Sequence, residues 1–294
     1  MGRLLLDCTS IDIPADVYLR SVGEVFAEFG DLTQDSGNLS YGVQIEGERH
    51  FVKTAGRPED PRPFLTHEQR VELLRNAARL YDVCNHFTLP RLYRVIESPA
   101  GPMLVYEWID GDLVGTPRAL REEPGSAFQR FRRLPSSTVL AALDAVYDLH
   151  NELARLGWIA VDFYDGCLIY DFVSERLRVV DLDMYRQGPF QNKLGRLFGS
   201  SRFMAPEEFK TGALIDEQTN VFVMGRTALI FLSDGTDNPD AFRASRALLE
   251  VIVKACAPVR SARFDSMASF YHAWREARKK ADEEQPISAP ASSD

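Results

Sequence analysis

The hydrophobic pattern of this chain changes its period near residue 110, and this change constrains the fold more than any other feature. Before it, short apolar runs bounded by turn-forming residues predict β-strands, together with one amphipathic helix over residues 66–84. After it, apolar residues recur mainly at helical spacing, over 136–156, 216–232, 241–255 and 266–278. The sequence therefore predicts an α+β protein with a small β-rich N-terminal part and a larger helical C-terminal part.

Turn formers and helix signals predict the order of the elements. A first helix is expected from Asp12 and Pro14 up to Gly30, followed by strands within residues 32–54. Further strands are expected over 91–96, 102–108, 167–170 and 178–180. The chain is thus expected to have three parts: an N-terminal lobe over 1–110, a helical C-terminal lobe over 111–281, and a disordered tail over 282–294.

The composition excludes several classes of protein. Hydrophobic residues make up 45% and charged residues 26% of the 294 residues, as in globular proteins, which excludes fibrous and wholly disordered chains. The chain has 34 Lys and Arg against 43 Asp and Glu, a net charge of −9, and no basic stripe. We therefore expect neither nucleic acid nor a membrane as a partner. Four scattered cysteines and the lack of an apolar leader predict a cytoplasmic protein.

A glycine-bearing segment followed by a strand-end lysine is the first sign of chemistry. The residues around Gly37 and Gly42 are expected to form a turn between two strands, whose bare backbone could lie against phosphates, although ordinary hairpins have the same composition. Lys53 ends the next strand, where its ammonium could reach those phosphates or stay solvated. Glu68 and Glu72 lie one turn apart on the following helix, and we prefer Glu72 as the partner of Lys53.

Four segments in the second half resemble, in order, motifs of the eukaryotic-type serine/threonine protein kinases. They are 179–183 (VVDLD), similar to the DFG element, 203–208 (FMAPEE), similar to MAPEE, 219–225 (TNVFVMG), similar to SDVYSLG, and 262–264 (ARF), similar to the late xxRF motif. The resemblance covers roughly residues 32–277 and is to a divergent form of the family. It implies a bilobal protein kinase-like fold, ATP bound beside a hinge over 103–111, and an ion pair between Glu207 and Arg263.

The resemblance also implies a role for each candidate site residue. It gives Lys53 the place of the family's phosphate-contacting lysine and Glu72 the place of its helix partner. It makes Asp181 the Mg²⁺ ligand. It further implies that backbone groups of Glu107 and Ile109 contact adenine.

The catalytic loop departs from the family pattern. Asp162 occupies the place of the catalytic aspartate, but the family's His-Arg pair is replaced by residues 160–161 (AV) and its Mg²⁺-binding Asn by Cys167. A neutral thiol is a poor ligand for a hard cation. Either Asp183 or Asp165 could supply the missing oxygen, or both could be turn and cap residues.

The predicted function is ATP-dependent phosphoryl transfer to a Ser or Thr hydroxyl of a protein substrate, with ATP and Mg²⁺ as cofactors. Two alternatives stay open. A phosphotransferase acting on a small hydroxyl compound fits the paired acids Asp181 and Asp183, although the 203–208 segment argues against it. A nucleotide-binding pseudokinase acting as a scaffold fits the altered loop, although Lys53 and Asp162, together with Asp181, weigh against it.

Overall fold

The structure, a computed structural model, describes residues 5–30, 37–59 and 65–284. The chain forms two compact units, each made of two stretches of sequence. The first, which we call the sheet unit, comprises Met1–Leu113 and Cys167–Arg186. The second, the helical unit, comprises Val114–Gly166 and Gln187–Asp294. A five-stranded antiparallel sheet at the N-terminus, followed by a mixed helical and strand region, confirms the α+β class.

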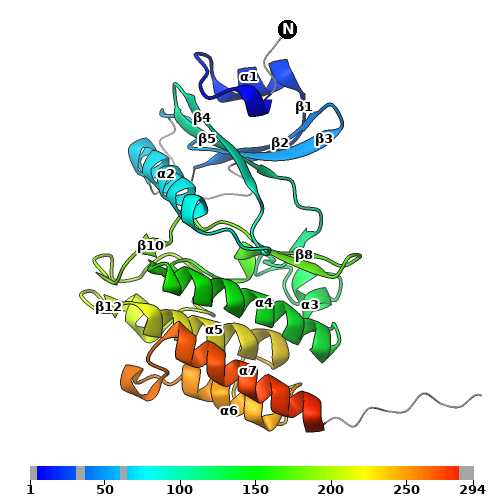
Figure 1. The fold of residues 1–294 in the computed structure, drawn as a ribbon, viewed down its shortest axis with the longest axis vertical. Helices are drawn as coiled ribbons and strands as arrows, with labels where there is room; N and C mark the ends of the chain where they lie inside the picture. The colour runs from blue at the N-terminus through cyan, green and yellow to red at the C-terminus, as the bar shows by residue number, and fades with distance from the viewer. Residues whose placement is uncertain (1–4, 31–36, 60–64, 285–294) are drawn as a thin grey trace, which may run out of the picture. The chain divides into compact units, whose positions relative to one another are not determined.

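The sheet unit is built around five antiparallel strands in the order β1-β2-β3-β5-β4 (Figure 1). Their bounds are β1 Glu24–Phe29, β2 Leu39–Ile45, β3 Glu48–Thr54, β4 Leu92–Ser98 and β5 Gly101–Glu107. The other elements are η1 Leu5–Asp7, α1 Ala15–Val22, α2 His67–Val83, and a small second sheet of β6 Asp112–Leu113, β8 Leu168–Asp171 and β9 Arg176–Val179. The β2–β3 hairpin turns at Glu46 and Gly47, which both have positive φ, as tight hairpins require.

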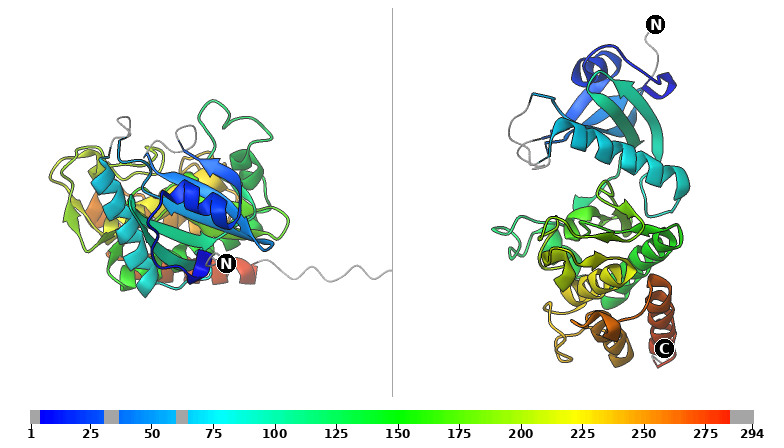
Figure 2. Two further views of the ribbon diagram at one scale, coloured as in Figure 1. Left: turned by 90° about the horizontal axis from the view of Figure 1, so that it is seen from above. Right: turned by 90° about the vertical axis from the view of Figure 1, so that its left-hand side faces the viewer.

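One helix packs on each face of the five-stranded sheet (Figure 2). The cluster on the α1 face includes Leu19, Val43, Val52 and Val105. The cluster on the α2 face includes Leu74, Ala77, Leu104 and Tyr106. Since side chains alternate along a strand and Val52 faces α1, the next residue, Lys53, faces the side of α2.

The prediction of a single helix up to Gly30 is wrong in its second half. Helix α1 ends at Val22, and the following residues form β1, which pairs with β2. Along β1 the side chains alternate between exposed and half-buried, as expected of an edge strand. A short apolar run can fit either a helix or a strand, and here the hydrogen bonds to β2 decide it.

The helical unit contains the long helices that the sequence predicts. Its elements are α3 Ala127–Arg132, α4 Ser136–Arg155, β7 Trp158–Ile159, β11 Phe190–Gln191, η3 Pro206–Phe209, β12 Leu214–Ile215, α5 Glu217–Leu232, α6 Arg246–Ala255, η4 Arg260–Ala262 and α7 Met267–Glu284. Two short elements, η2 Asp165–Cys167 and β10 Arg186–Gln187, cross the boundary between the units. Helix α5 is buried almost all round and contacts α4, α6 and α7, so it forms the core of this unit.

The C-terminal helix runs further than predicted. Helix α7 continues to Glu284, so the predicted disordered tail over 282–294 is wrong for residues 282–284. The rest of the predicted tail lies outside the described residues. Across the described part of the chain, none of the helices has both the length and the apolar character needed to cross a membrane.

Candidate functional site

Lys53, near the end of β3, contacts two carboxylates within the sheet unit. Its Nζ donates a hydrogen bond to Oδ1 of Asp181 at 2.6 Å. The same Nζ lies 2.6 Å from Oδ2 of Asp183, so the lysine pairs with both acids. Lys53 and Asp183 are buried, whereas the side chain of Asp181 is 51% exposed. The structure thus brings Lys53 together with the two acids that the sequence singled out far along the chain.

One ammonium facing two carboxylates leaves this cluster with an excess of negative charge. Burial would lower the pKa of Lys53, but Asp181 and Asp183 outweigh burial and raise that pKa, so the lysine stays protonated. Burial raises the pKa of Asp183, Lys53 opposes this shift, and Asp181 adds to it. The carboxylate of Asp183 is therefore only partly neutralised, and a further cation would stabilise it.

The segment that carries the two acids is held from both sides. Asp181 has a φ of +63°, in the left-handed region that residues other than glycine rarely adopt. Before it, the backbone N–H of Val180 donates to the carbonyl of Cys167 at 2.8 Å. After it, Nδ2 of Asn76 on α2 donates to the carbonyls of Asp183 and Tyr185 at 3.0 and 2.6 Å. Sequence reasoning missed Asn76, because a single amide on a helix forms no pattern.

The structure does not bring Glu72 to Lys53. Glu72 is on α2, but its carboxylate is 64% exposed and pairs with Arg79 at 2.7 Å. The buried residues Leu74 and Ala77 mark the face of α2 that packs on the sheet, and helical geometry places Glu72 on the opposite side of the helix. The prediction that these two residues pair is therefore wrong in this structure, and the two aspartates take the place predicted for Glu72.

Gly42 does not lie in a turn, as the sequence suggested, but in the middle of β2. It faces the same side of the sheet as Lys53. A Cβ at this position would lie 2.7 Å from the ring of Phe26 and 2.8 Å from that of Trp108. The glycine is needed because two aromatic rings pack directly on the strand backbone.

Gly37 adopts the conformation expected of a turn glycine, with a φ of +83°. Its carbonyl accepts a hydrogen bond from the guanidinium of Arg70, a fully buried residue of α2 that also donates to the carbonyl of Arg57 at 3.0 Å. Sequence reasoning missed Arg70, whose side chain fixes the end of the glycine segment to the helix. The role of Gly37 and Gly42 in phosphate binding stays a prediction.

The face of the sheet beside Lys53 is rich in aromatic rings. The centroids of Phe26 and Trp108 lie 4.8 Å apart, and those of Phe51 and Tyr106 lie 6.5 Å apart. Such rings offer flat surfaces on which a planar heterocycle can stack. In the predicted hinge, the backbone N–H of Glu107 already donates to the carbonyl of Arg91 at 2.8 Å, so a base would have to use other groups of Glu107. The predicted backbone contact of Ile109 with adenine stays a prediction.

Asp162, the predicted catalytic residue, lies in the loop after β7 in the helical unit. It is half-buried and has a φ of +65°, so its backbone is strained. Buried Asn220 of α5 holds the loop two residues earlier. Its Nδ2 donates to the carbonyl of Ala160 at 2.8 Å, and its Oδ1 accepts from the N–H of Ala160 at 2.9 Å. The amide of Asn220 can make both bonds, whereas an ionised aspartate, the residue typical of the compared kinase motif at this position, could only accept hydrogen bonds.

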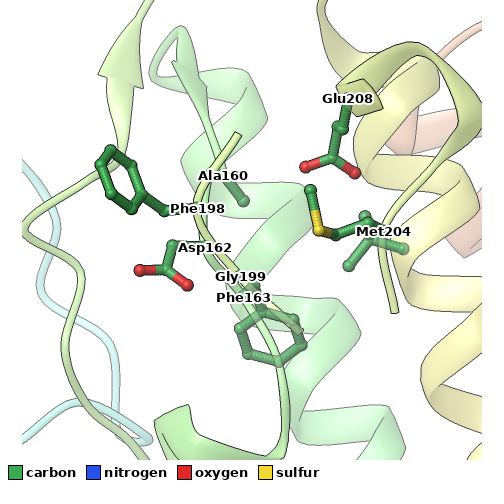
Figure 3. Close-up of a pocket in the computed structure, with 8 residues that line it drawn as sticks. Ala160, Asp162, Phe163, Phe198, Gly199, Met204 and Glu208 are labelled. Atoms are coloured by element: carbon green, nitrogen blue, oxygen red, sulfur yellow. The ribbon is translucent and has the colours of Figure 1, made fainter. Parts of the chain in front are cut away.

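Asp162 lines a small recess in the helical unit, shown in Figure 3. Gly199, Met204 and Glu208 also line the recess. In this view the carboxylates of Asp162 and Glu208 lie on either side of Ala160. The recess is too narrow for a water-sized sphere, so it is a packing gap beside Asp162 and not a substrate pocket.

Glu208 is a buried carboxyl that the sequence did not single out as a site residue. Its Oε2 accepts a hydrogen bond from the N–H of Ala205 at 2.6 Å. Burial raises the pKa of Glu208 to about 7, and the nearby carboxylate of Glu207 adds to the shift. Glu208 therefore titrates close to neutral pH, within the segment that the sequence compares with MAPEE.

Asp165 has a partner within the helical unit. Its carboxylate is buried and accepts a hydrogen bond from the guanidinium of Arg202. The ion pair links the loop that carries Asp162 to the segment before η3. Of the two roles considered for Asp165, this contact supports the structural one.

The predicted ion pair between Glu207 and Arg263 is confirmed. The fully buried guanidinium of Arg263 donates to Oε1 and Oε2 of Glu207 at 2.6 and 3.0 Å. Arg260 donates to Oε1 of Glu207 at 2.8 Å and also pairs with Asp216 at the N-terminus of α5. Burial would raise the pKa of Glu207, but the hydrogen bonds from Arg263 and Thr219 contribute to holding it below its usual value.

Within the described residues, no three His, Cys, Asp or Glu side chains are grouped so that they could hold a metal ion. Any metal in the sheet unit would therefore have to take ligands beyond Asp181 and Asp183. Comparison with models of known protein families finds no match, and comparison with curated proteins finds none either.

Arg263→Ala should lower the free energy of unfolding by about 3–5 kcal/mol, because it leaves a buried carboxylate without its main partner. Thermal unfolding followed by circular dichroism measures the loss. The control is Arg246→Ala, which removes an arginine whose side chain is 89% exposed and should cost less than about 1 kcal/mol. Equal melting temperatures for the two variants would contradict the importance of the pair.

Asn220→Asp should destabilise the helical unit by about 1–3 kcal/mol, because a carboxylate oxygen would then face the carbonyl of Ala160 without a proton between them. The loss should shrink at acidic pH, where a protonated Asp can donate. Asn238→Asp is the control, since that exposed side chain acts through its oxygen, which accepts from the N–H of Asp240. A loss of stability that does not depend on pH would argue against the two-bond arrangement.

Glu208→Gln should become more stable relative to the wild type as the pH rises. Below a pH of about 4.5 the carboxyl is protonated in both states; between 4.5 and about 7 only the unfolded state ionises, which lowers the stability of the wild type. Above pH 7 the difference should level off at a value on the order of 3 kcal/mol. Melting temperatures across this range test the prediction, with exposed Glu250→Gln as control. A constant difference between Glu208→Gln and the wild type would refute it.

Proposed function

We propose that this protein is an ATP-dependent phosphotransferase with a protein kinase-like fold, acting on a Ser or Thr hydroxyl of a protein substrate. The observation that carries the proposal is the contact of buried Lys53 with Asp181 and Asp183. A lysine on a central strand beside two adjacent acids provides the charges that phosphoryl transfer from a nucleotide requires. The confirmed Glu207–Arg263 pair supports the same resemblance.

The sheet unit carries the proposed nucleotide site. The ammonium of Lys53 would hold phosphate oxygens, and the aromatic face with Phe51 and Tyr106 would pack against the base. Asp181 and Asp183 fit Mg²⁺, because both are hard oxygen donors and their combined charge exceeds that of Lys53. Mg²⁺ in such sites keeps phosphate and water ligands and neutralises phosphate charge, so two carboxylates suffice.

In the proposed reaction, Asp162 would act on the substrate hydroxyl. Its carboxylate would accept a hydrogen bond from the substrate hydroxyl, orient it, and take its proton during transfer. The clamp from Asn220 to Ala160 holds the loop that presents this carboxylate. Rigid support matters because catalysis of phosphoryl transfer depends mainly on positioning and on electrostatic stabilisation.

One observation favours the second candidate, a phosphotransferase for small hydroxyl compounds. Asp183 contacts Lys53 as closely as Asp181 does, and paired acids of this kind resemble those enzymes. Against this candidate stands the buried cluster of Glu207 with Arg260 and Arg263, which supports a segment typical of protein kinases. We therefore place the protein substrate first and test both acceptors.

Transfer of labelled phosphate from ATP should be detected with Mg²⁺ and should fall on the order of 100-fold or more in Lys53→Met and in Asp162→Asn. Asp183→Asn should reduce transfer more than ATP binding, because the metal neutralises charge that develops during the reaction. Lys279→Met, which removes an exposed lysine of α7, is the matched control and should retain full transfer. Generic protein substrates and small hydroxyl compounds are compared as acceptors.

The outcomes separate the three possibilities. Transfer to protein supports the main proposal, and transfer only to small compounds supports the second candidate. Binding of ATP, seen as a rise in melting temperature that Lys53→Met abolishes, without transfer to any acceptor in Mg²⁺ or Mn²⁺, would indicate a pseudokinase. Neither binding nor transfer would overturn the assignment of the Lys53 cluster.

A further inference from the structure

Three arginines of the helical unit lie close to one buried aromatic ring, that of Phe128 in α3, a helix labelled in Figure 1. The guanidinium carbons of Arg121, Arg132 and Arg202 lie 6.0, 5.5 and 5.2 Å from the centroid of this ring. These residues come from the loop before α3, from α3 itself and from the segment before η3. The fold therefore gathers positive charge from three separate segments of a chain whose net charge is −9.

These arginines have more N–H donors than the protein supplies acceptors for. Each guanidinium has five N–H donors. Arg121 donates to the carbonyl of Thr116, Arg132 to the carbonyl of Ser233 and Arg202 to the carboxylate of Asp165. The Nε atoms of all three arginines are buried and have no hydrogen-bond partner. Three unsatisfied buried donors around a single ring are unusual, because buried polar groups in native proteins are nearly always paired.

The charges around Phe128 do not balance either. Asp165 is the buried acid of the cluster and pairs with Arg202. Glu122 is exposed and accepts a hydrogen bond from Gln129 at 3.0 Å, and Arg118 adds a further positive charge. Burial lowers the pKa of Arg121, and the neighbouring guanidinium of Arg202 lowers it further, which reflects repulsion between the two cations. An anion beside the accessible ends of these guanidinium groups would remove this repulsion.

We propose that Arg121 and Arg202, beside Phe128, form a binding site for a phosphate monoester. Two guanidinium groups match the oxygens of a phosphate dianion, which can accept several charge-assisted hydrogen bonds at once. The side chain of Arg202 is 26% exposed and Arg121 is half-buried, so a ligand from solvent can reach both. The ligand is a phosphate group carried on a protein as phosphoserine, or a free or small-molecule phosphate.

Binding of a phosphate at this site does not require catalysis. The use we assign to it, selection of phosphorylated substrates, rests on the proposed function. Arg202 bonds to Asp165, three residues after Asp162, so the site lies on the same loop as the proposed catalytic carboxylate. Under phosphoryl transfer, it would select substrates that already carry a phosphate. The experiment measures binding without ATP, so a failure of transfer and a failure of this site give different results.

The full-length protein is titrated, without ATP, into a fluorescent peptide that carries one phosphoserine among Gly and Ala, and into the same peptide with serine. The phosphopeptide should bind at least about tenfold more tightly, and inorganic phosphate should compete with it. Arg121→Gln should weaken binding about tenfold or more, while Arg133→Gln, an exposed arginine at the end of α3, should change it less than about twofold.

Two further measurements keep the proposal falsifiable. Arg121→Gln should melt no lower than Arg133→Gln without phosphate, since it removes the repulsion, and it should gain less melting temperature when inorganic phosphate is added. Arg202→Lys keeps the charge beside Asp165 but has fewer donors, and should bind the phosphopeptide more weakly than the wild type. Inorganic phosphate binding as tightly as the phosphopeptide would assign the site to small phosphates. Equal affinity of the wild type and Arg121→Gln for both probes would overturn it.

Discussion

The buried carboxylate of Glu207 determines how the helical unit is held together. Burying a charge is unfavourable unless partners surround it, and here Arg263, Arg260 and Thr219 provide them. Arg260 lies in η4, Arg263 follows it and Thr219 lies in α5, so a single carboxylate of η3 ties these segments to the central helix of the unit. Arg263 gives its remaining donors to backbone carbonyls, including those of Ala257 and Gln218. The network is complete, and it therefore specifies one arrangement of these segments.

Two clusters, one in each unit, show the opposite situation, in which charges are brought together without being balanced. Lys53 faces two acids, and the Phe128 cluster of the helical unit has three guanidinium groups around one buried acid. Unbalanced charge reduces stability, so a ligand of opposite charge would stabilise each cluster, as we propose. The two clusters have opposite excess charge. One is suited to a cation together with nucleotide phosphates, and the other to an anion.

Long periodic elements were predictable from the sequence, and individual contacts were less so. Helix α4 and helix α2, with its Thr66 cap, follow the predicted ranges closely, because apolar spacing and caps are local signals. Strand β1 was missed because its short apolar run also fits a helix. The prediction that Lys53 pairs with Glu72 was wrong. The sequence places Glu72 on helix α2 but does not show which face of that helix packs on the sheet. The rings on Gly42 come from distant positions, which left no local pattern to find.

The sequence by itself determined the α+β class, the order of most elements, and the positions of the residues on which the proposal rests, among them Lys53, Asp181, Glu207 and Arg263. Each of these stands at the end of an apolar strand or within a recognisable motif, and such signals depend only on neighbouring residues. Tertiary structure alone decided the partners. It pairs Lys53 with Asp181 and Asp183, bonds Asn220 to the backbone of Ala160, and places three arginines beside the ring of Phe128. Partners are decided by packing, because a buried donor or charge must take whichever acceptor the fold places beside it, at any distance along the chain.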